Sequence, residues 1–417
     1  MNARADRFPH FDSLRAIGCL GVIVGHCAAF GDMVPPGAAI EPYIEQAPAV
    51  LMLFFFVSGF LLYRPFVAAR LSGRPQPSFL AYGWRRVLRI LPAYWVALVL
   101  ITLWLGSNPH IQSSQPPPSV FSLDGVFLYF GFAQTYTRES FAGGLPQAWT
   151  LNVEAVYYAL LPAFVAFMAW WAPRRKGPLT IRRDLLAVGV LIATTYVYIA
   201  VILVAGAGPG TGSLPFLSWI PGFLDFIALG MGLAVLSVAA QSRPEPTRAE
   251  RFIDRWPGIF WIIAAIAFWV VSTQIGLYGT PAAEETTVQG LGRHALYAVI
   301  GICIALPAVF GDPRRGLVRK ILGARPLAHF GLVSYGVYVW HVAIIVQLDR
   351  WGWGDHTIIH PYVHWLVPAI LLSWLAGSLS YYLVERPVLS LKRLVPAGPA
   401  TRDQPGAVSA PAVPPAV

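Results

Sequence analysis

Residues 47–66 read APAVLMLFFFVSGFLLYRPF, an apolar run of 20 residues in which Arg64 is the only charged side chain. A helix needs about 20 mostly apolar residues to cross the hydrocarbon core of a bilayer. Nine further runs of this kind cover roughly 13–31, 86–106, 149–171, 184–206, 215–238, 256–276, 292–310, 327–347 and 362–384. The sequence therefore predicts an all-α, polytopic membrane bundle of about ten transmembrane helices.

The composition agrees with lipid as the main solvent of the chain. Of its 417 residues, 56% are hydrophobic and 12% are charged, whereas a soluble domain carries about 25% charged residues. A net charge of +10 would suggest a nucleic-acid partner in a soluble protein. Here basic loops account for the charge, and we expect no nucleic acid. The three cysteines lie in apolar runs, so neither a disulfide framework nor a metal site is expected.

The loop charges predict the orientation of the bundle. Basic residues gather in cytoplasmic loops of membrane proteins. Here they occupy every second loop and the C-terminal segment, while the alternate loops hold only Arg138, Arg293 and Arg350 beside several acids. The basic loops contain Arg70, Arg74, Arg85, Arg174, Arg175, Lys176, Arg182, Arg183, Arg243, Arg248, Arg251, Arg255, Arg314, Arg315, Arg319, Lys320 and Arg325. This alternation predicts that both termini are cytoplasmic.

Two segments fall outside the ten predicted spans. Residues 120–133 are apolar but short, so they form either a re-entrant or interfacial piece or an eleventh span. Residues 394–417 are rich in Ala and Pro with few charges, which predicts a disordered cytoplasmic tail. The remaining residues, 1–393, are predicted to form one membrane domain.

Ionisable residues inside membrane spans are costly and therefore mark candidate functional positions. Arg15 and His26 lie eleven residues apart in the first span, which puts them on one helix face about 16 Å apart. Arg15 alone could be a snorkelling anchor, and His26 alone could make a helix–helix hydrogen bond. Their shared face favours a functional pair.

Arg86 and Arg89 are neighbours on one face of the third span. At that depth a guanidinium group needs an anionic partner, and phosphate matches its geometry best. The alternative is ordinary positive charge at the cytoplasmic boundary, which suits Arg85 better than Arg89.

The other candidate positions are carboxylates, aromatic residues and one serine. Glu154 is either a partner for a buried cation or an acceptor for a substrate hydroxyl, and Asp225 is a weaker carboxylate of the same kind. Ser58 lies beside Gly59, where close helix packing is the simpler reading and substrate contact the second. Tyr338 and His341 lie deep in the ninth span, with His341 at a depth similar to that of His26. Glu385 and Arg386, which end the last span, are interpreted as structural charges paired with loop residues.

Taken in order, these segments resemble the acyltransferase 3 family of bacterial membrane O-acyltransferases over about residues 8–390. The resemblance rests on Phe11–Arg15 with His26, Phe55–Phe60, Arg86–Trp95, Trp149–Glu154, Ser334–His341 and Glu385–Pro387. Phe11 and Ser13 stand where the family more often has Leu and Gly. Some members carry a fused extracytoplasmic hydrolase-like domain, and this chain resembles a stand-alone member.

The resemblance implies a multi-pass protein of the bacterial plasma membrane that transfers an acyl group, usually acetyl from acetyl-CoA, to a hydroxyl group. The acceptor would be a carbohydrate, a glycolipid or a glycosylated metabolite such as a macrolide. The resemblance also implies that the Arg15/His26 and Arg86/Arg89 pairs are needed for activity. It implies that the reaction uses no metal ion.

These residues suggest a mechanism. The phosphates of acetyl-CoA would bind Arg86, Arg89 and Arg15, and the acyl end would reach His26. His26 would act as a general base on the acceptor hydroxyl, or would carry the acyl group covalently.

Glu154 would orient that base or bind the acceptor. Ser58, Tyr338 and His341 are the candidate substrate-binding residues. The main alternative is a secondary transporter for an anionic or polar solute. Such carriers usually have inverted repeats and broken helices, neither of which the sequence indicates. A non-catalytic scaffold would not need buried charges.

Overall fold

The computed structural model describes residues 8–31, 38–106, 117–141, 143–171, 178–205, 214–277, 285–353 and 361–396. Within these ranges the chain forms helices joined by turns, without a strand. The long helices are α1 (Phe11–Gly31), α3 (Met52–Ser72), α4 (Phe79–Leu105), α7 (Trp149–Trp171), α8 (Pro178–Val204), α10 (Leu224–Gln241), α12 (Pro257–Thr273), α13 (Thr287–Val309), α16 (Ser334–Arg350) and α17 (Pro361–Ser380). The all-α prediction is confirmed.

Short helices connect or extend these. They are α2 (Glu41–Glu45), η1 (Ala47–Leu51), α5 (Leu123–Gly125), η2 (Val126–Phe130), η3 (Gln134–Tyr136), α6 (Arg138–Phe141), η4 (Pro146–Ala148), α9 (Leu214–Leu217), η5 (Ile220–Phe223), α11 (Arg248–Arg255), α14 (Leu317–Leu322), α15 (Arg325–Leu332), η7 (Tyr381–Glu385), α18 (Arg386–Leu389) and η8 (Ser390–Leu394).

Eight helical segments of the described chain are long and apolar enough to cross a membrane, and the number rises to 10 when two sharply bent helix pairs each count as one span. Each of the ten predicted runs coincides with one of these segments. Large apolar side chains on the outside of α8, such as Leu186, Val190 and Val197, are exposed, as expected for a face that contacts lipid. The structure therefore confirms a multi-pass membrane protein.

The ninth predicted span is broken, which corrects the prediction of one continuous helix over 327–347. α15 ends at Leu332, α16 begins at Ser334, and the two axes differ by 78°. α15 lies flat against α1, where a Cβ on Gly331 would overlap the backbone carbonyl of Asp12. This close contact holds α15 along α1, while α16 turns away at Val333 and enters the bundle. The sequence argument that the chain has no broken helix is therefore wrong.

Residues 120–133 do not form a span. They fold into α5 and η2, which is one turn of π-helix, and neither is among the candidate spans. Two hydrogen bonds hold this segment on α4: the Tyr94 hydroxyl donates to the carbonyl of Tyr129 (2.8 Å) and Trp95 Nε1 donates to that of Phe130 (3.1 Å). The basic residues predicted at 174–176 and the predicted tail from position 397 onward lie outside the described residues.

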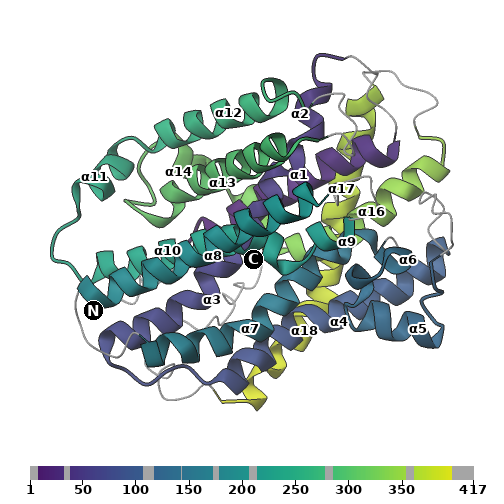
Figure 1. Cartoon of the computed structure of the whole chain (residues 1–417). Helices are drawn as coiled ribbons and strands as arrows, with labels where there is room; N and C mark the ends of the chain where they lie inside the picture. Colours follow the sequence, from purple (N-terminus) through teal and green to yellow (C-terminus); the bar gives the residue numbers. More distant parts are fainter. Residues whose placement is uncertain are drawn as a thin grey trace, which may run out of the picture.

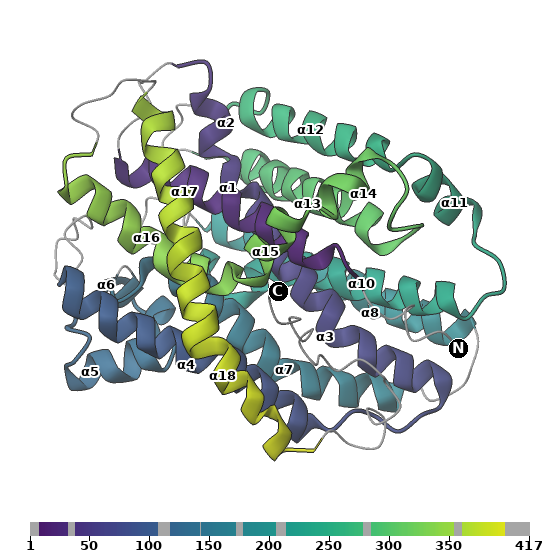
Figure 2. The ribbon, with the colours of Figure 1, turned by 180° about the vertical axis from the view of Figure 1, so that it is seen from behind.

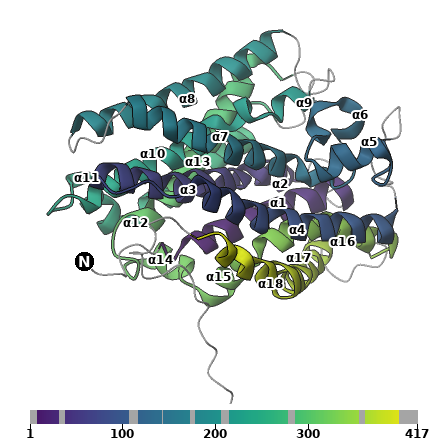
Figure 3. The same ribbon diagram turned by 90° about the horizontal axis from the view of Figure 1, so that it is seen from below.

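Helices α3 and α10 form the centre of the bundle, with α7 and α8 on one side and α15, α17 and α18 on the other (Figure 3). The backbones of α3 and α10 touch at two glycines. A Cβ on Gly59 would overlap the carbonyl of Ile227, and one on Gly230 would overlap that of Phe56. Small residues permit such close approach between membrane helices. The packing reading of Gly59 is thus supported, and it fixes the orientation of Ser58, the preceding residue.

The two ends of the bundle differ in their loops. Figure 1 shows α11 and α14 toward one end and α2, α5 and α6 toward the other. We call the first the basic end, because its helices carry Arg248, Arg251, Arg319 and Lys320. On the face seen in Figure 2, α17 packs against α1 and α16 and continues through η7 into α18, which packs on α4. This path carries Glu385 back to the third predicted span.

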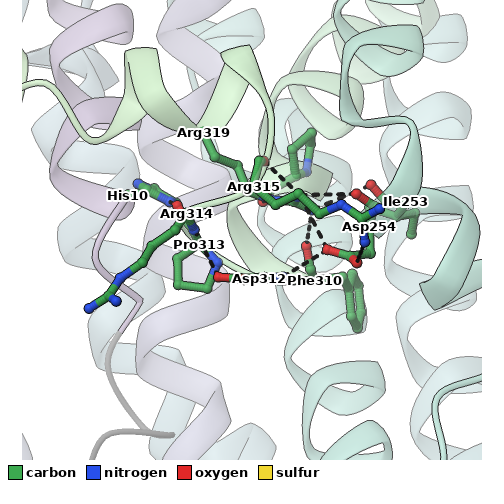
Figure 4. Close-up of polar contacts among 10 residues, drawn as sticks. His10, Ile253, Asp254, Phe310, Asp312, Pro313, Arg314, Arg315 and Arg319 are labelled. Carbon is green, nitrogen blue, oxygen red and sulfur yellow. Dashed lines mark hydrogen bonds and ion pairs between the residues drawn. The ribbon is translucent and has the colours of Figure 1, made fainter.

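A buried arginine organises the basic end (Figure 4). The side chain of Arg319 is fully buried. Its Nε donates to the carbonyl of Pro307 (2.9 Å) and its Nη2 to that of Phe310 (2.6 Å), while Nη1 lies 3.4 Å from Asp254 Oδ1. Asp254 also binds the more exposed Arg315 at 3.1 Å. Arg319 thereby joins three elements: α11, the end of α13, and its own helix α14. This residue, predicted as a loop charge, therefore stabilises the packing of these helices.

Replacing Arg319 by alanine is expected to lower the free energy of unfolding by about 3 kcal/mol, because buried carbonyl groups lose their donor and Asp254 loses a partner. Thermal unfolding in detergent micelles measures the loss. The matched variant is Arg315→Ala, whose side chain is 59% exposed, and exposed ion pairs contribute about 1 kcal/mol or less. Equal losses in the two variants would contradict this role for Arg319.

Candidate active site

A central cavity of about 340 Å³ lies between α1, α3, α4, α7 and α16. Six of the eight candidate residues from the sequence line it: Arg15, Ser58, Arg86, Arg89, Glu154 and Tyr338. The rest of its wall consists of Leu51, Phe54, Phe55, Leu61, Leu62, Ile90, Thr150, Leu151, Tyr158, Ser334 and Tyr335. The structure thus brings together polar residues from five helices that are far apart in the sequence.

Glu154 accepts two hydrogen bonds in this cavity. Ser58 Oγ donates to Glu154 Oε1 at 2.8 Å, and the Tyr158 hydroxyl donates to Glu154 Oε2 at 2.9 Å. Tyr158 was not predicted, although its position four residues after Glu154 puts both on one helix face. Hydroxyl groups, rather than a cation in direct contact, therefore hold this carboxylate in place.

The three arginines of the cavity differ in their partners. Arg15 Nη1 binds Asp12 Oδ1 at 2.8 Å, and Arg89 Nη1 binds Glu385 Oε2 at 3.0 Å. Glu385 is 1% exposed, so its interpretation as a partner of loop charges is wrong: it neutralises an arginine of the cavity wall. Glu385 is the last residue of the π-helical turn η7, and such turns often occur at functional sites.

Arg86 has no ion pair in the described part of the chain. Its guanidinium group lies over the ring of Tyr158, 5.7 Å from the centroid, and its buried Nε atom lacks a hydrogen-bond partner among the described residues. A buried donor without a partner is unfavourable. Arg86 is therefore the cavity residue most in need of an anion.

The break between α15 and α16 adds to the positive potential of the cavity. Because α16 begins at Ser334, its first residues, Ser334 and Tyr335, line the cavity. The N-terminus of a helix carries partial positive charge and unpaired N–H groups. Because Arg15 and Arg89 are each paired with a carboxylate, Arg86 and this helix N-terminus are the positive groups that remain for an anionic ligand among the described residues of the cavity.

His26 and His341 do not line the cavity but bind each other. His26 Nδ1 lies 2.7 Å from His341 Nε2, with the two rings nearly parallel, and His341 Nδ1 lies 2.6 Å from the carbonyl of Tyr338. A carbonyl oxygen only accepts, so Nδ1 of His341 must carry a proton. In a neutral pair, Nε2 of His341 then accepts from His26 Nδ1, and Nε2 of His26 is the basic nitrogen. This assignment follows from the hydrogen bonds.

Tyr338 separates the cavity from the histidine pair. Its ring lies 5.6 Å from that of His341 and 6.0 Å from that of Phe54. Its hydroxyl group is held by Thr150 Oγ1 at 2.6 Å and donates to the carbonyl of Gln147. The cavity therefore reaches Arg15 but ends at Tyr338, short of His26 farther along α1.

The chain is similar in sequence to known proteins. Residues 8–384 match a protein family described as Acyltransferase domain. The peptidoglycan O-acetyltransferase OatA of Listeria monocytogenes is 24% identical over 394 residues, which are 91% of this chain and 55% of that protein. Nodulation protein 10 of Rhizobium leguminosarum bv. viciae is 24% identical over 399 residues, 92% of this chain and 94% of that protein.

The O-acetyltransferase OatA of Staphylococcus aureus strain NCTC 8325 is 23% identical over 386 residues, 91% of this chain and 57% of that protein. This chain thus spans little more than half the length of both OatA proteins. No solved structure matches it.

Proposed function

The chain belongs to this acyltransferase family, and we propose that it is a membrane O-acetyltransferase. Acetyl-CoA is the donor, and the acceptor is a hydroxyl group of a carbohydrate, a glycolipid or a glycosylated metabolite. Two relatives with similar sequences are named for O-acetyl transfer, and one of these for peptidoglycan, a glycan. The observation that carries the proposal is the arginine-rich cavity, in which Arg86 has no carboxylate partner among the described residues.

The donor fits this cavity in charge. Coenzyme A carries several phosphate groups, and arginine binds phosphate through paired hydrogen bonds. Arg86 binds them first, because it has no carboxylate partner among the described residues. The N-terminus of α16 adds partial positive charge, and Arg89 and Arg15, which are paired with Glu385 and Asp12, add further hydrogen-bond donors.

The length of the cavity also matches the length of the donor. The cavity wall runs from Leu62 on α3 to Leu51, the last residue of η1, and eleven residues of helix extend about 16 Å. An extended pantetheine arm covers a similar span between the phosphates and the thioester. Its amide groups then pass Ser58 and Glu154, and its acyl end approaches Tyr338, next to the histidine pair.

The proposed reaction is direct transfer. His26 Nε2 takes the proton of the acceptor hydroxyl, and the acceptor oxygen attacks the carbonyl carbon of the thioester. The new C–O bond forms, the C–S bond breaks, and the proton passes to the leaving thiolate. His341 fixes the tautomer of His26, so we propose it as a positioning residue rather than as a substrate-binding one.

The proposed orientation places the basic end in the cytoplasm, where acetyl-CoA is made. The acceptor then meets His26 from the opposite end of the bundle. Both termini are cytoplasmic in this arrangement.

Binding of acetyl-CoA tests the proposal directly. We expect acetyl-CoA at 100 times its Kd to stabilise the purified protein by about 2.7 kcal/mol, read as a rise in Tm. S-acetylpantetheine, which lacks the phosphates, should produce a much smaller rise at the same concentration. No rise in Tm with acetyl-CoA, together with no CoA release when a mixture of glycan acceptors is added, would contradict the proposal.

The broken helix α15–α16 supports a second candidate, a secondary transporter, because transporters bind anions at the ends of discontinuous helices. Proteoliposomes separate the two functions. A transporter takes up solute without releasing CoA, whereas the transferase releases one CoA for each acylated acceptor.

A further inference from the structure

A second pocket, of about 150 Å³, lies away from the central cavity. It is built from the last turns of α8 and the first turns of α3, α10 and α13, so it lies toward the end of the bundle opposite the basic end. Its wall consists of Met52, Ile199, Leu203, Leu217, Gly222, Phe223, Phe226, Gly290, Arg293, His294 and Tyr297. None of the residues assigned to acyl transfer lines it.

Arg293 and His294, the two basic side chains of this pocket, each lie beside a carboxylate. Arg293 Nη2 lies 2.9 Å from Glu285 Oε2, and His294 Nε2 lies 2.9 Å from Asp225 Oδ2. The side chains of Glu285 and Asp225 are 3% and 1% exposed. Glu285 Oε1, both carboxyl oxygens of Asp225 and His294 Nε2 are buried without a hydrogen-bond partner in the described part of the chain, so the contact between His294 and Asp225 is a close approach rather than a hydrogen bond. Polar groups in and beside the pocket wall therefore remain unsatisfied.

The remaining wall is aromatic and apolar. The ring of Phe226 packs against His294, with 4.5 Å between centroids, and Phe223 lies beside it on the pocket wall. Tyr297 lies on the polar side of the pocket, and its hydroxyl group donates a hydrogen bond to Gln46 Oε1 at 2.7 Å. The pocket thus combines flat apolar surfaces with a polar rim of both hydrogen-bonding types.

We propose that this pocket binds one ring of a neutral carbohydrate. An anion would find Arg293 and His294 already matched by carboxylates, and a cation would find those carboxylates already matched by Arg293 and His294. Hydroxyl groups both donate and accept, so they can bind the guanidinium group of Arg293 and the ring of His294, which line the pocket, without adding charge. The apolar face of a sugar ring packs on aromatic side chains.

The pocket adjoins the acyl-transfer site. Phe223 lines the pocket, and its ring lies 5.2 Å from that of Phe55, which lines the central cavity. Met52 and Leu51, which are consecutive in the chain, line the pocket and the cavity respectively. As far as the proposed function holds, the pocket therefore retains a sugar of the acceptor next to the ring that is acylated. Sugar binding itself does not depend on that function.

Sugar binding to the full-length protein in detergent tests this inference without acetyl-CoA. The probes are glucose, galactose, mannose, N-acetylglucosamine and N,N′-diacetylchitobiose, and the readout is Tm. At least one probe should raise the Tm of the wild type, and His294→Ala and Phe223→Leu should each weaken its binding at least tenfold, as expected for a lost buried partner. The matched control is His364→Ala, which removes a histidine that stacks on Trp353 away from the pocket.

A third variant covers the case in which these changes unfold the protein. In Gly290→Ala the added methyl group would lie 2.6 Å from Leu203 Cδ1 and narrow the pocket, while alanine strengthens the helix. This variant should fold and lose sugar binding.

The inference is overturned if no probe shifts the wild type, or if all three pocket variants bind as well as His364→Ala. A wild type that binds sugar in this pocket but transfers no acetyl group would refute only the proposed function. A wild type that acetylates a glycan but binds sugar independently of His294 and Phe223 would refute only the inference.

Discussion

His26→Ala is expected to lower the rate of acetyl transfer by about 10² to 10⁴, the usual contribution of a general base. The proposed role of the ring is to remove the acceptor proton through Nε2, and alanine has no group that could replace it. The variant should keep the Tm rise with acetyl-CoA, because His26 lies beyond the cavity. The loss is measured by comparing the wild type and the variant at saturating acetyl-CoA. The readout is the rate at which radiolabelled acetyl is transferred from acetyl-CoA to a glycan acceptor.

His341 provides the internal check on this prediction. If His341 fixes the tautomer of His26 through the 2.7 Å contact, His341→Ala should lower kcat while the KM for acetyl-CoA stays near that of the wild type. His341→Gln, whose amide oxygen can accept from His26 Nδ1, should recover part of the loss. Full activity in His26→Ala would remove the base from the mechanism, and full activity in His341→Ala would remove the tautomer argument.

Arg86→Gln is expected to raise the KM for acetyl-CoA by about 10- to 100-fold with little change in kcat, since hydrogen bonds to charged groups contribute about 1.5–3 kcal/mol. Such a pattern indicates an interaction made equally in the ground state and the transition state. Glutamine keeps part of the side-chain volume and removes the charge. Initial rates over a range of acetyl-CoA concentrations measure the effect.

The neighbouring residue supplies the matched control for Arg86. Arg85 does not line the cavity, so Arg85→Gln should leave the KM for acetyl-CoA near its wild-type value. S-acetylpantetheine supplies the second control: without phosphates it should be used equally poorly by the wild type and by Arg86→Gln. A phosphate-free donor that still distinguishes the two proteins would place the contact of Arg86 elsewhere on the donor.

Hydropathy was enough to predict the long helices, and the ionisable residues within them predicted the charged part of the cavity. Buried charges in apolar runs identified Arg15, Arg86, Arg89 and Glu154, and all four line one cavity. The prediction succeeds because an ionisable side chain inside a membrane span costs free energy, so such residues are retained mainly where they have a role.

The missing parts are long-range pairings. Arg89 and Glu385 are 296 residues apart, and nothing local in either segment indicates the other. The same holds for Asp225, whose partner His294 lies on another helix. The break at Val333 has no proline as a signal, because docking of α15 on α1 produces it. Tyr158 alone carried a usable signal, its helical spacing from Glu154.

The glycine contacts between α3 and α10 have a consequence for how the protein can diverge. Both pockets take part of their wall from this pair: Ser58 and Met52 from α3, and Phe226 from α10. The distance between the two helices is set by backbone atoms at Gly59 and Gly230 rather than by side chains. Lining residues can therefore be exchanged without moving one pocket relative to the other. In the proposed roles of the two pockets, donor and acceptor preference are free to evolve separately on a shared frame, whereas the two glycines are not free to change.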